Sequence, residues 1–312
     1  MKRFHNILYV SNGVGDEGQS IKQALKLAND NNAKLSVLVA CPPFPDHLND
    51  YKTTYEQSIT EQMEKTIDAA RSSLKITEKA VSVQVSLLSD KALNVQIVRH
   101  VIQNSHDLLI KNAESSNNSK GFKALDMQLL RNCPCALYLS KSFKHAQKKA
   151  RVAVAIDAVD DKKEARKLSI NLLELSHAMA QHYSGKLNVI TCWNFIFEDY
   201  LRDSVWVKTT DEELERLLKE EKESHLKKLE SLMQEAKVTD ENQIHLLKGR
   251  PEVQIPSFIH ESNIDILVMG TVARTGITGF IIGNTAENIL QELDCSLLAL
   301  KPAGFVSPIS PY

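Results

Sequence analysis

The sequence predicts an α/β protein built from two tandem copies of one domain. Its 312 residues exceed the usual size of a single compact core. Short apolar runs typical of strands alternate with longer stretches typical of helices, and this order implies parallel strands joined by right-handed crossovers. Segments of the first half also recur in the second half at a nearly constant interval.

The elements of the first half follow in a regular order. After the first strand, Ile21, Leu25 and Ala28 mark one face of a helix. A long polar helix is expected over 51–74, and another helix carries an apolar stripe from Val95 to Ile102. The strands are expected at 7–10, 35–40, 81–85, 108–110 and 136–139, with a short helix before the last one.

The second half starts the same order again, with strands expected at 152–156, 187–191 and 264–269. Thr210 is expected to cap a long helix, and Glu213 three residues later completes a capping box. Leucines spaced along this helix predict its buried face, and the glutamates and lysines opposite predict a solvated face.

Matching segments show the duplication directly. The triplet at 95–97 recurs at 253–255, and Asp107-Leu108-Leu109 recurs as Asp265-Ile266-Leu267, both 158 residues later. Cys135 and Lys141 match Cys295 and Lys301 at an interval of 160 residues. We therefore expect one domain at 1–143, a lysine-rich linker, a second domain at 150–303, and a flexible tail at 304–312.

Composition excludes several classes of function. The formal net charge of -1 gives no reason to expect a nucleic-acid partner, and no apolar run is long enough to span a membrane. The N-terminus lacks the pattern of a secretory signal, so a cytoplasmic location is expected. The five cysteines and ten histidines show no metal-site spacing, and we interpret the cysteines, Cys133-Pro134-Cys135 included, as reduced and mostly buried rather than redox-active.

A glycine-bearing loop in the second half predicts a phosphate site. The apolar strand over 264–269 runs into Gly270, and Gly283 stands directly before a helical stripe. Amides at a helix N-terminus and the positive end of its dipole favour an anion, and glycine lets the backbone approach closely. Asn284 is expected to cap the helix, with Glu287 three residues later. Thr271, Arg274 and Thr285 would add donors to phosphate oxygens.

These residues resemble the universal stress protein family, whose ATP-binding members carry the motif Gly-x2-Gly-x9-Gly-Ser/Thr. Gly270 and Gly283 match its first and last glycines, but Ala273 replaces the middle glycine and Asn284 the hydroxyl residue, for which Thr285 would substitute. The loop and both halves look most like the tandem E-type members. The resemblance implies two domains, each a five-stranded parallel sheet of order 3-2-1-4-5 flanked by helices. Asp157 and Gly270 then flank one crevice, with Asp157 on the base or ribose of the nucleotide.

The first copy departs from this pattern. Asn12 stands where the second copy has Asp157, Asn112 aligns with Gly270, and Lys123 aligns with Gly283. A side chain at a close-approach glycine keeps the backbone from a phosphate. The first copy is therefore expected to be structural or to bind something else.

Aromatic residues gather after the second strand of the second half and admit two interpretations. They form a lid on the domain core, or they line an apolar pocket beside the phosphate loop that suits a ligand with an apolar part. The segment contains Trp193, Phe195, Phe197, Tyr200 and Trp206.

The first expectation is that this is a stress-response protein that binds ATP or another nucleotide in its second domain. The sequence leaves open whether a metal binds with the nucleotide. An enzyme with slow ATP hydrolysis or self-phosphorylation ranks lower, because no catalytic base is evident. An adaptor with an unused crevice is the third hypothesis. Family members associate through their fifth strand, so the copies are expected to form an internal pseudo-dimer, as a monomer or as a homodimer of tandem chains.

Overall fold

The protein is described here from a computed structural model that covers residues 4–114, 120–145, 149–203, 209–238, 242–271 and 282–312. The chain divides into two compact units. Unit 1 comprises residues 1–142, 271–282 and 294–312, and unit 2 comprises residues 143–270 and 283–293. The predicted α/β class is confirmed, since strands and helices alternate in both units.

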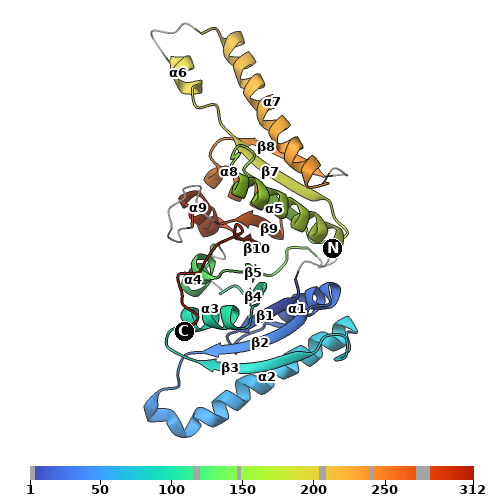
Figure 1. Ribbon diagram of the computed structural model, residues 1–312, viewed down its shortest axis with the longest axis vertical. Coiled ribbons are helices and arrows are strands. Elements are labelled where there is room, and N and C mark those ends of the chain that lie inside the picture. The colour runs from blue at the N-terminus through green and yellow to red at the C-terminus, as the bar shows by residue number, and fades with distance from the viewer. Residues whose placement is uncertain (1–3, 115–119, 146–148, 204–208, 239–241, 272–281) are drawn as a thin grey trace. The chain divides into compact units, whose positions relative to one another are not determined.

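Unit 1 contains a sheet whose first five strands lie in the order β3-β2-β1-β4-β5, all parallel. α1 packs beside α2, and α3 packs beside α4 (Figure 1). β10 extends this sheet by pairing antiparallel with β5, with Leu298 opposite Tyr138. The strands are β1 (Asn6–Ser11), β2 (Lys34–Cys41), β3 (Val83–Ser89), β4 (Leu108–Asn112), β5 (Ala136–Ser140) and β10 (Ser296–Leu300). The helices are α1 (Gly18–Asn31), α2 (Lys52–Leu74), α3 (Leu93–Gln103) and α4 (Ala124–Asn132), and the short 3-10 helix η1 (Asp46–Tyr51) precedes α2.

Unit 2 repeats the order of the first four strands as β8-β7-β6-β9, again parallel. Its helix pairs are α5 with α7 and α8 with α9. The strands are β6 (Val152–Ala155), β7 (Leu187–Trp193), β8 (Gln243–Lys248) and β9 (Ile266–Gly270). The helices are α5 (Lys163–His182), α6 (Glu198–Asp203), α7 (Asp211–Glu235), α8 (Pro251–Glu261) and α9 (Asn284–Glu292).

The central strands are apolar because helices cover both faces of the sheet. In β1, the four residues from Ile7 to Val10 are at most 1% exposed, which is typical of a central parallel strand. The predicted cap of α7 is confirmed, because the Thr210 hydroxyl accepts a hydrogen bond from the backbone N–H of Glu213 at 3.2 Å.

The aspartate that the repeat conserves has the same structural role in both units. The Asp107 carboxylate accepts the backbone N–H groups of His5 at 2.7 Å and Asn6 at 3.1 Å, and so holds the start of β1. Asp265 accepts the N–H groups of Lys144 at 2.7 Å and Arg151 at 2.8 Å, just before β6. These aspartates anchor the first strand of each copy.

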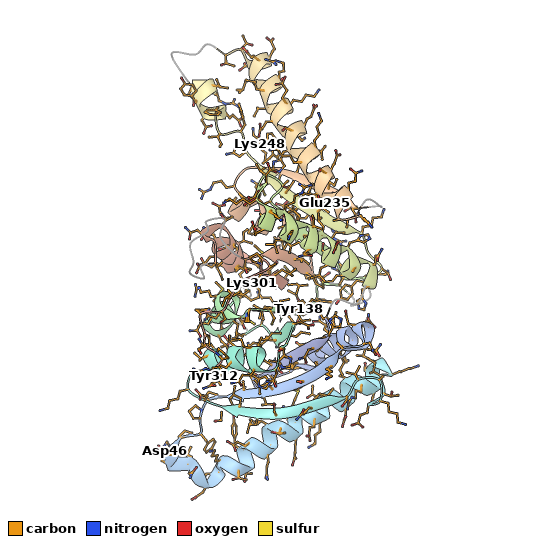
Figure 2. The ribbon with its side chains drawn as sticks, in the orientation of Figure 1. Asp46, Tyr138, Glu235, Lys248, Lys301 and Tyr312 are labelled. Atoms are coloured by element: carbon orange, nitrogen blue, oxygen red, sulfur yellow. The ribbon has the colours of Figure 1, made fainter. Side chains whose placement is uncertain are left out.

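The C-terminal residues lie beside α3 (Figure 1). Arg99 donates hydrogen bonds to the carbonyl oxygens of Ser310 at 3.2 Å and Tyr312 at 3.0 Å, and Gln103 donates to that of Pro311 at 2.7 Å. Tyr312 is labelled at this position in Figure 2. The flexibility expected of 304–312 and the domain boundaries stay predictions.

Candidate functional site

Two of the predicted site residues lie at one edge of the sheet of unit 2. β6 pairs in parallel with β9, with Val154 opposite Val268. The carboxyl ends of the two strands therefore meet, with Asp157 following β6 and Gly270 ending β9. Asp157 is half-buried, and its carboxylate accepts the backbone N–H of Val159 at 3.2 Å. This edge is a topological switch point, where open α/β sheets bind ligands.

The helix that follows the predicted phosphate loop begins at Asn284, and Gly283 is its N-cap residue. The expected capping role of Asn284 is therefore wrong, because Asn284 already lies within the helix. Gly283 has an extended backbone, with φ −59° and ψ 140°, and its carbonyl accepts the first helical hydrogen bond from Glu287 at 2.9 Å. Glycine has no side chain to cap the helix, so the amides of Asn284, Thr285 and Ala286 have no partner from a capping side chain or from within the helix.

Gly270 lies close to α5. A Cβ atom at this position would lie 2.9 Å from Cδ2 of Leu168, in α5. The absence of a side chain at Gly270 therefore lets α5 lie close to the end of β9, whether or not a ligand is bound. Because the clashing atom is a mobile methyl group, Leu168 would move slightly to accommodate alanine.

The remaining predicted residues have different outcomes. Thr271 is fully buried, its N–H donates to the carbonyl of Leu300 at 3.4 Å, and its hydroxyl has no hydrogen-bond partner within the described part of the chain. Arg274 and Ala273 lie outside the described residues. Thr285 is exposed in the first turn of α9.

In the first copy, a buried ion pair takes the place of an open helix N-terminus. Asp126, in the first turn of α4, is 160 positions before Ala286, and Lys111 is 158 positions before Met269. The Lys111 Nζ lies 2.9 Å from the Asp126 carboxylate, and the two side chains are 3% and 0% exposed. The other carboxylate oxygen accepts the N–H of Glu114 at 2.9 Å. The first copy therefore carries its own anion at this helix N-terminus.

A second carboxylate lies on the same side of the first copy. Glu17, the residue before α1, is 5% exposed and accepts hydrogen bonds from the Tyr9 hydroxyl at 3.0 Å and the N–H of Asn12 at 3.2 Å. Burial raises the pKa of Glu17, and the nearby Lys111 ammonium opposes this shift. Burial also raises the pKa of Tyr9. The corresponding residue before α5 is Lys162, which is exposed. The two copies thus present opposite charges at this position.

His225 is a residue at the unit 2 edge that the sequence did not indicate. It lies in α7, is 4% exposed, and its Nε2 is 2.8 Å from the hydroxyl of Thr191 in β7. Burial lowers the pKa of His225, and the negative charge of Asp157 partly opposes this shift. The charge of Asp157 therefore acts on His225 within unit 2.

Unit 2 is expected to lose stability as the pH falls through about 6.5, the ordinary pKa of histidine. Burial lowers the pKa of His225 from 6.5 in the folded protein, so the unfolded chain binds the proton more readily. The stabilisation is complete above the unfolded pKa and is lost as the pH falls toward the folded pKa. His225→Gln would flatten this pH dependence, as measured by urea midpoints between about pH 7.5 and 5.5.

Part of the slope should persist in that variant, because burial also lowers the pKa of His245 in the same unit. Equal slopes for the wild type and His225→Gln would contradict the assignment.

The aromatic segment divides into a buried part and an exposed part. Trp193 is 7% exposed, whereas Phe197 and Tyr200 are 61% and 56% exposed. Phe195 and Phe197 contact each other edge to face, with ring centroids 6.1 Å apart. Lys248 pairs with Glu198 at 2.7 Å next to this segment, and Lys248 is labelled in Figure 2. Trp206 lies outside the described residues. The lid and the pocket both stay predictions.

Two kinds of feature are absent from the described residues. No helix there has the length and apolar content needed to cross a bilayer. No group of three or more His, Cys, Asp and Glu side chains there has the geometry of a metal site.

Comparisons with known proteins agree with this architecture. The model of the universal stress protein family matches residues 150–301. The chain is 25% identical to universal stress protein E of Photorhabdus laumondii, with 99% of this chain and 98% of the relative covered. It is also 25% identical to universal stress protein E of Escherichia coli K12, again with 99% and 98% covered.

Solved structures share the fold over nearly the whole chain. A crystal structure from Pseudomonas aeruginosa UCBPP-PA14 has a TM-score of 0.71 at 23% identity, and covers 96% of this chain and 94% of that chain. The structure of a universal stress protein from Archaeoglobus fulgidus DSM 4304 has a TM-score of 0.62 at 15% identity, and covers 96% and 97%. On the duplicated fold, the family match of its second copy and its full-length E-type relatives, this chain belongs to the universal stress protein family.

Proposed function

We propose that this protein acts in the stress response by binding ATP or a related nucleotide at the carboxyl edge of β6 and β9. The observation that carries this proposal is the contrast between α4 and α9. α4 holds the buried carboxylate of Asp126 in its first turn, whereas α9 has Ala286 at the matching position and a glycine N-cap. The first copy has a buried carboxylate at this position, whereas the second copy has a methyl group there, with Glu287 as the acidic residue of the same turn.

Phosphate suits the first turn of α9 on physical grounds. The amides of Asn284, Thr285 and Ala286 point out of the helix, and the helix dipole adds a partial positive charge there. The Thr285 hydroxyl is exposed in the same turn and would donate a further hydrogen bond. Lys162 and Lys163, both exposed at the start of α5, add positive charge in unit 2 where the first copy has buried Glu17.

Asp157 would orient the sugar or base of the nucleotide. Its half-buried carboxylate lies at the end of β6, the strand next to β9. By resemblance to ATP-binding family members, the carboxylate would accept hydrogen bonds from ribose hydroxyls or from the base. A ligand with an apolar part would in addition use the exposed Phe197 and Tyr200, which follow the next strand, β7.

The proposal is tested by mass spectrometry of the small molecules that copurify with the full chain, followed by calorimetric titration with ATP. We expect saturable ATP binding at one site per chain, weakened about tenfold in Asp157→Asn because the amide keeps one acceptor oxygen and one hydrogen bond to a charged acceptor is lost. Phosphate release by the wild type that Asp157→Asn abolishes would favour the enzyme instead. No binding of ATP or of an acylated nucleotide would refute the proposal and leave the adaptor.

The copies are proposed to form an internal pseudo-dimer through their fifth strands. The antiparallel pairing of β10 with β5 supports this arrangement. The oligomeric state of the whole chain, monomer or homodimer of tandem chains, would be measured by light scattering.

A further inference from the structure

Two cysteine thiols lie against each other where α4 ends and β5 begins. Cys133 is the C-cap residue of α4, and its N–H donates to the carbonyl of Leu129 at 2.8 Å. The chain bends at Pro134 and Cys135 before it enters β5 at Ala136. This bend brings the two sulfur atoms to 3.4 Å. Because both thiols lie in one short turn, they stay close without the movement of a separate element.

We propose that Cys133 and Cys135 form a redox-active dithiol that closes to a disulfide by exchange with low-molecular-weight disulfides. The two sulfur atoms need to approach by about 1.4 Å to reach a disulfide bond length. Cys133 is fully buried, whereas Cys135 is half-buried and is the more exposed residue of the two. Cys135 therefore reacts first, and Cys133 resolves the product.

The charges around the pair favour a thiolate on Cys133. The hydrogen bond between the two sulfur atoms lowers the pKa of Cys133 and raises the pKa of Cys135. The Lys301 amine adds an attractive charge, and its Nζ donates to the carbonyl of Leu130 in the last turn of α4. Lys301 is labelled in Figure 2, and its Nζ lies 4.7 Å from the centre of the Phe305 ring. Burial lowers the pKa of Lys301 to about 8.

The reaction balances with a disulfide RSSR as the oxidant. The thiolate of Cys135 attacks one sulfur of RSSR, forms a mixed disulfide and releases RS⁻. The thiolate of Cys133 then attacks the Cys135 sulfur, the protein disulfide forms, and the second RS⁻ leaves. Overall, two protein thiols lose two protons and two electrons, and RSSR becomes two RSH. Deprotonation of Cys135 limits the first step, and Lys301 assists the second step by stabilising the Cys133 thiolate.

The second copy shows that the fold of this turn does not require a thiol at position 133. Leu293 occupies the matching C-cap of α9, with φ −70° and ψ 132° against φ −70° and ψ 127° for Cys133. Cys295 matches Cys135, so the second copy has one cysteine where the first has a pair. The backbone of this turn therefore forms the same way with leucine as with cysteine at the C-cap.

To test the proposal, the full chain is equilibrated with oxidised and reduced glutathione in the presence of a chelator. The free thiols are then alkylated under denaturing conditions, and the protein is digested with trypsin. Cleavage after Arg131 and Lys141 leaves both cysteines in one peptide, 132–141. We expect this peptide to become two hydrogens lighter and resistant to alkylation as the oxidised fraction rises, while Cys41, Cys192 and Cys295 remain alkylated. A peptide alkylated at both sulfurs at every ratio, or one that stops at a stable glutathione adduct, would overturn the proposal.

Variants distinguish the attacking thiol of Cys135 from the resolving thiol of Cys133. Cys133→Leu, which copies Leu293, should retain the fold and accumulate the glutathione adduct on Cys135, whereas Cys192→Ser should oxidise as the wild type does. Lys301→Met should slow disulfide closure by about 3- to 10-fold, since one unit of thiol pKa changes the thiolate fraction tenfold. An unchanged closure rate in Lys301→Met would remove Lys301 from the mechanism, and closure at a different cysteine pair would refute the assignment.

Discussion

Lys111→Ala is expected to destabilise unit 1 by about 3–5 kcal/mol, the cost of leaving a buried carboxylate without its partner. Asp126 is fully buried, and its oxygen lies 2.9 Å from the Lys111 ammonium. Without that ammonium, Asp126 stays charged at a high desolvation cost or takes up a proton and loses part of its interaction with the N–H of Glu114. Urea unfolding, followed by circular dichroism, would measure the loss.

The double variant Lys111→Met/Asp126→Leu is the matched control. It replaces both charges by apolar groups of similar volume, so most of the lost stability should return. Met269 and Ala286 at the matching positions of the second copy indicate that this environment accepts apolar side chains. If the free energy of unfolding of Lys111→Ala lies within about 1 kcal/mol of the wild-type value, water or another group compensates the charge of Asp126. The Lys111–Asp126 pair would then not be what blocks an anion site in the first copy.

Ala286→Asp is expected to weaken ATP binding by about 10- to 100-fold, because a carboxylate in the first turn of α9 repels phosphate at close range. The substitution copies Asp126, which occupies this position in the first copy. The new carboxylate would add negative charge beside the amides that the nucleotide is proposed to use. Calorimetric titration with ATP at low and high salt would measure the loss and its electrostatic share.

Ala286→Asn distinguishes charge from size in this experiment. Asparagine has nearly the same shape as aspartate but no charge, so affinity should be much closer to that of the wild type. Ala286 is 8% exposed, and both variants carry the same risk of disturbing α9. Equal weakening by Asp and Asn would assign the effect to packing and would contradict an anion site at this turn.

The sequence predicted the fold well because the signals for strands and repeats are local. Apolar runs such as Ile7–Val10 marked the central strands, and the interval of 158 residues aligned Asp107 with Asp265. The structure adds why these aspartates recur, since both bind N–H groups at the start of a strand. Sequence alone gave the spacing and could not give the hydrogen bonds.

The candidate site was predicted less completely. The Lys111–Asp126 pair escaped notice because Lys and Asp are mostly exposed, and only packing shows that this pair is buried. The sequence signal for this pair is its alignment with the apolar residues Met269 and Ala286 of the second copy. His225 lies in a different helix from any predicted site residue, so only tertiary structure places it where the charge of Asp157 acts on it. Asn284 was mistaken for the N-cap because helix ends are set by backbone conformation, within one or two residues of the sequence signal.

Phosphate groups are proposed to bind at the first turn of α9, and the amide chemical shifts of this turn would report such binding. The ¹H–¹⁵N resonances of Asn284, Thr285 and Ala286 would be followed while ATP is added to the full chain. Saturable shifts at these three amides are predicted, with the matching amides of α4, at Ala124, Leu125 and Asp126, unmoved. Shifts that leave the α9 amides unchanged, or that appear equally in α4, would contradict the account.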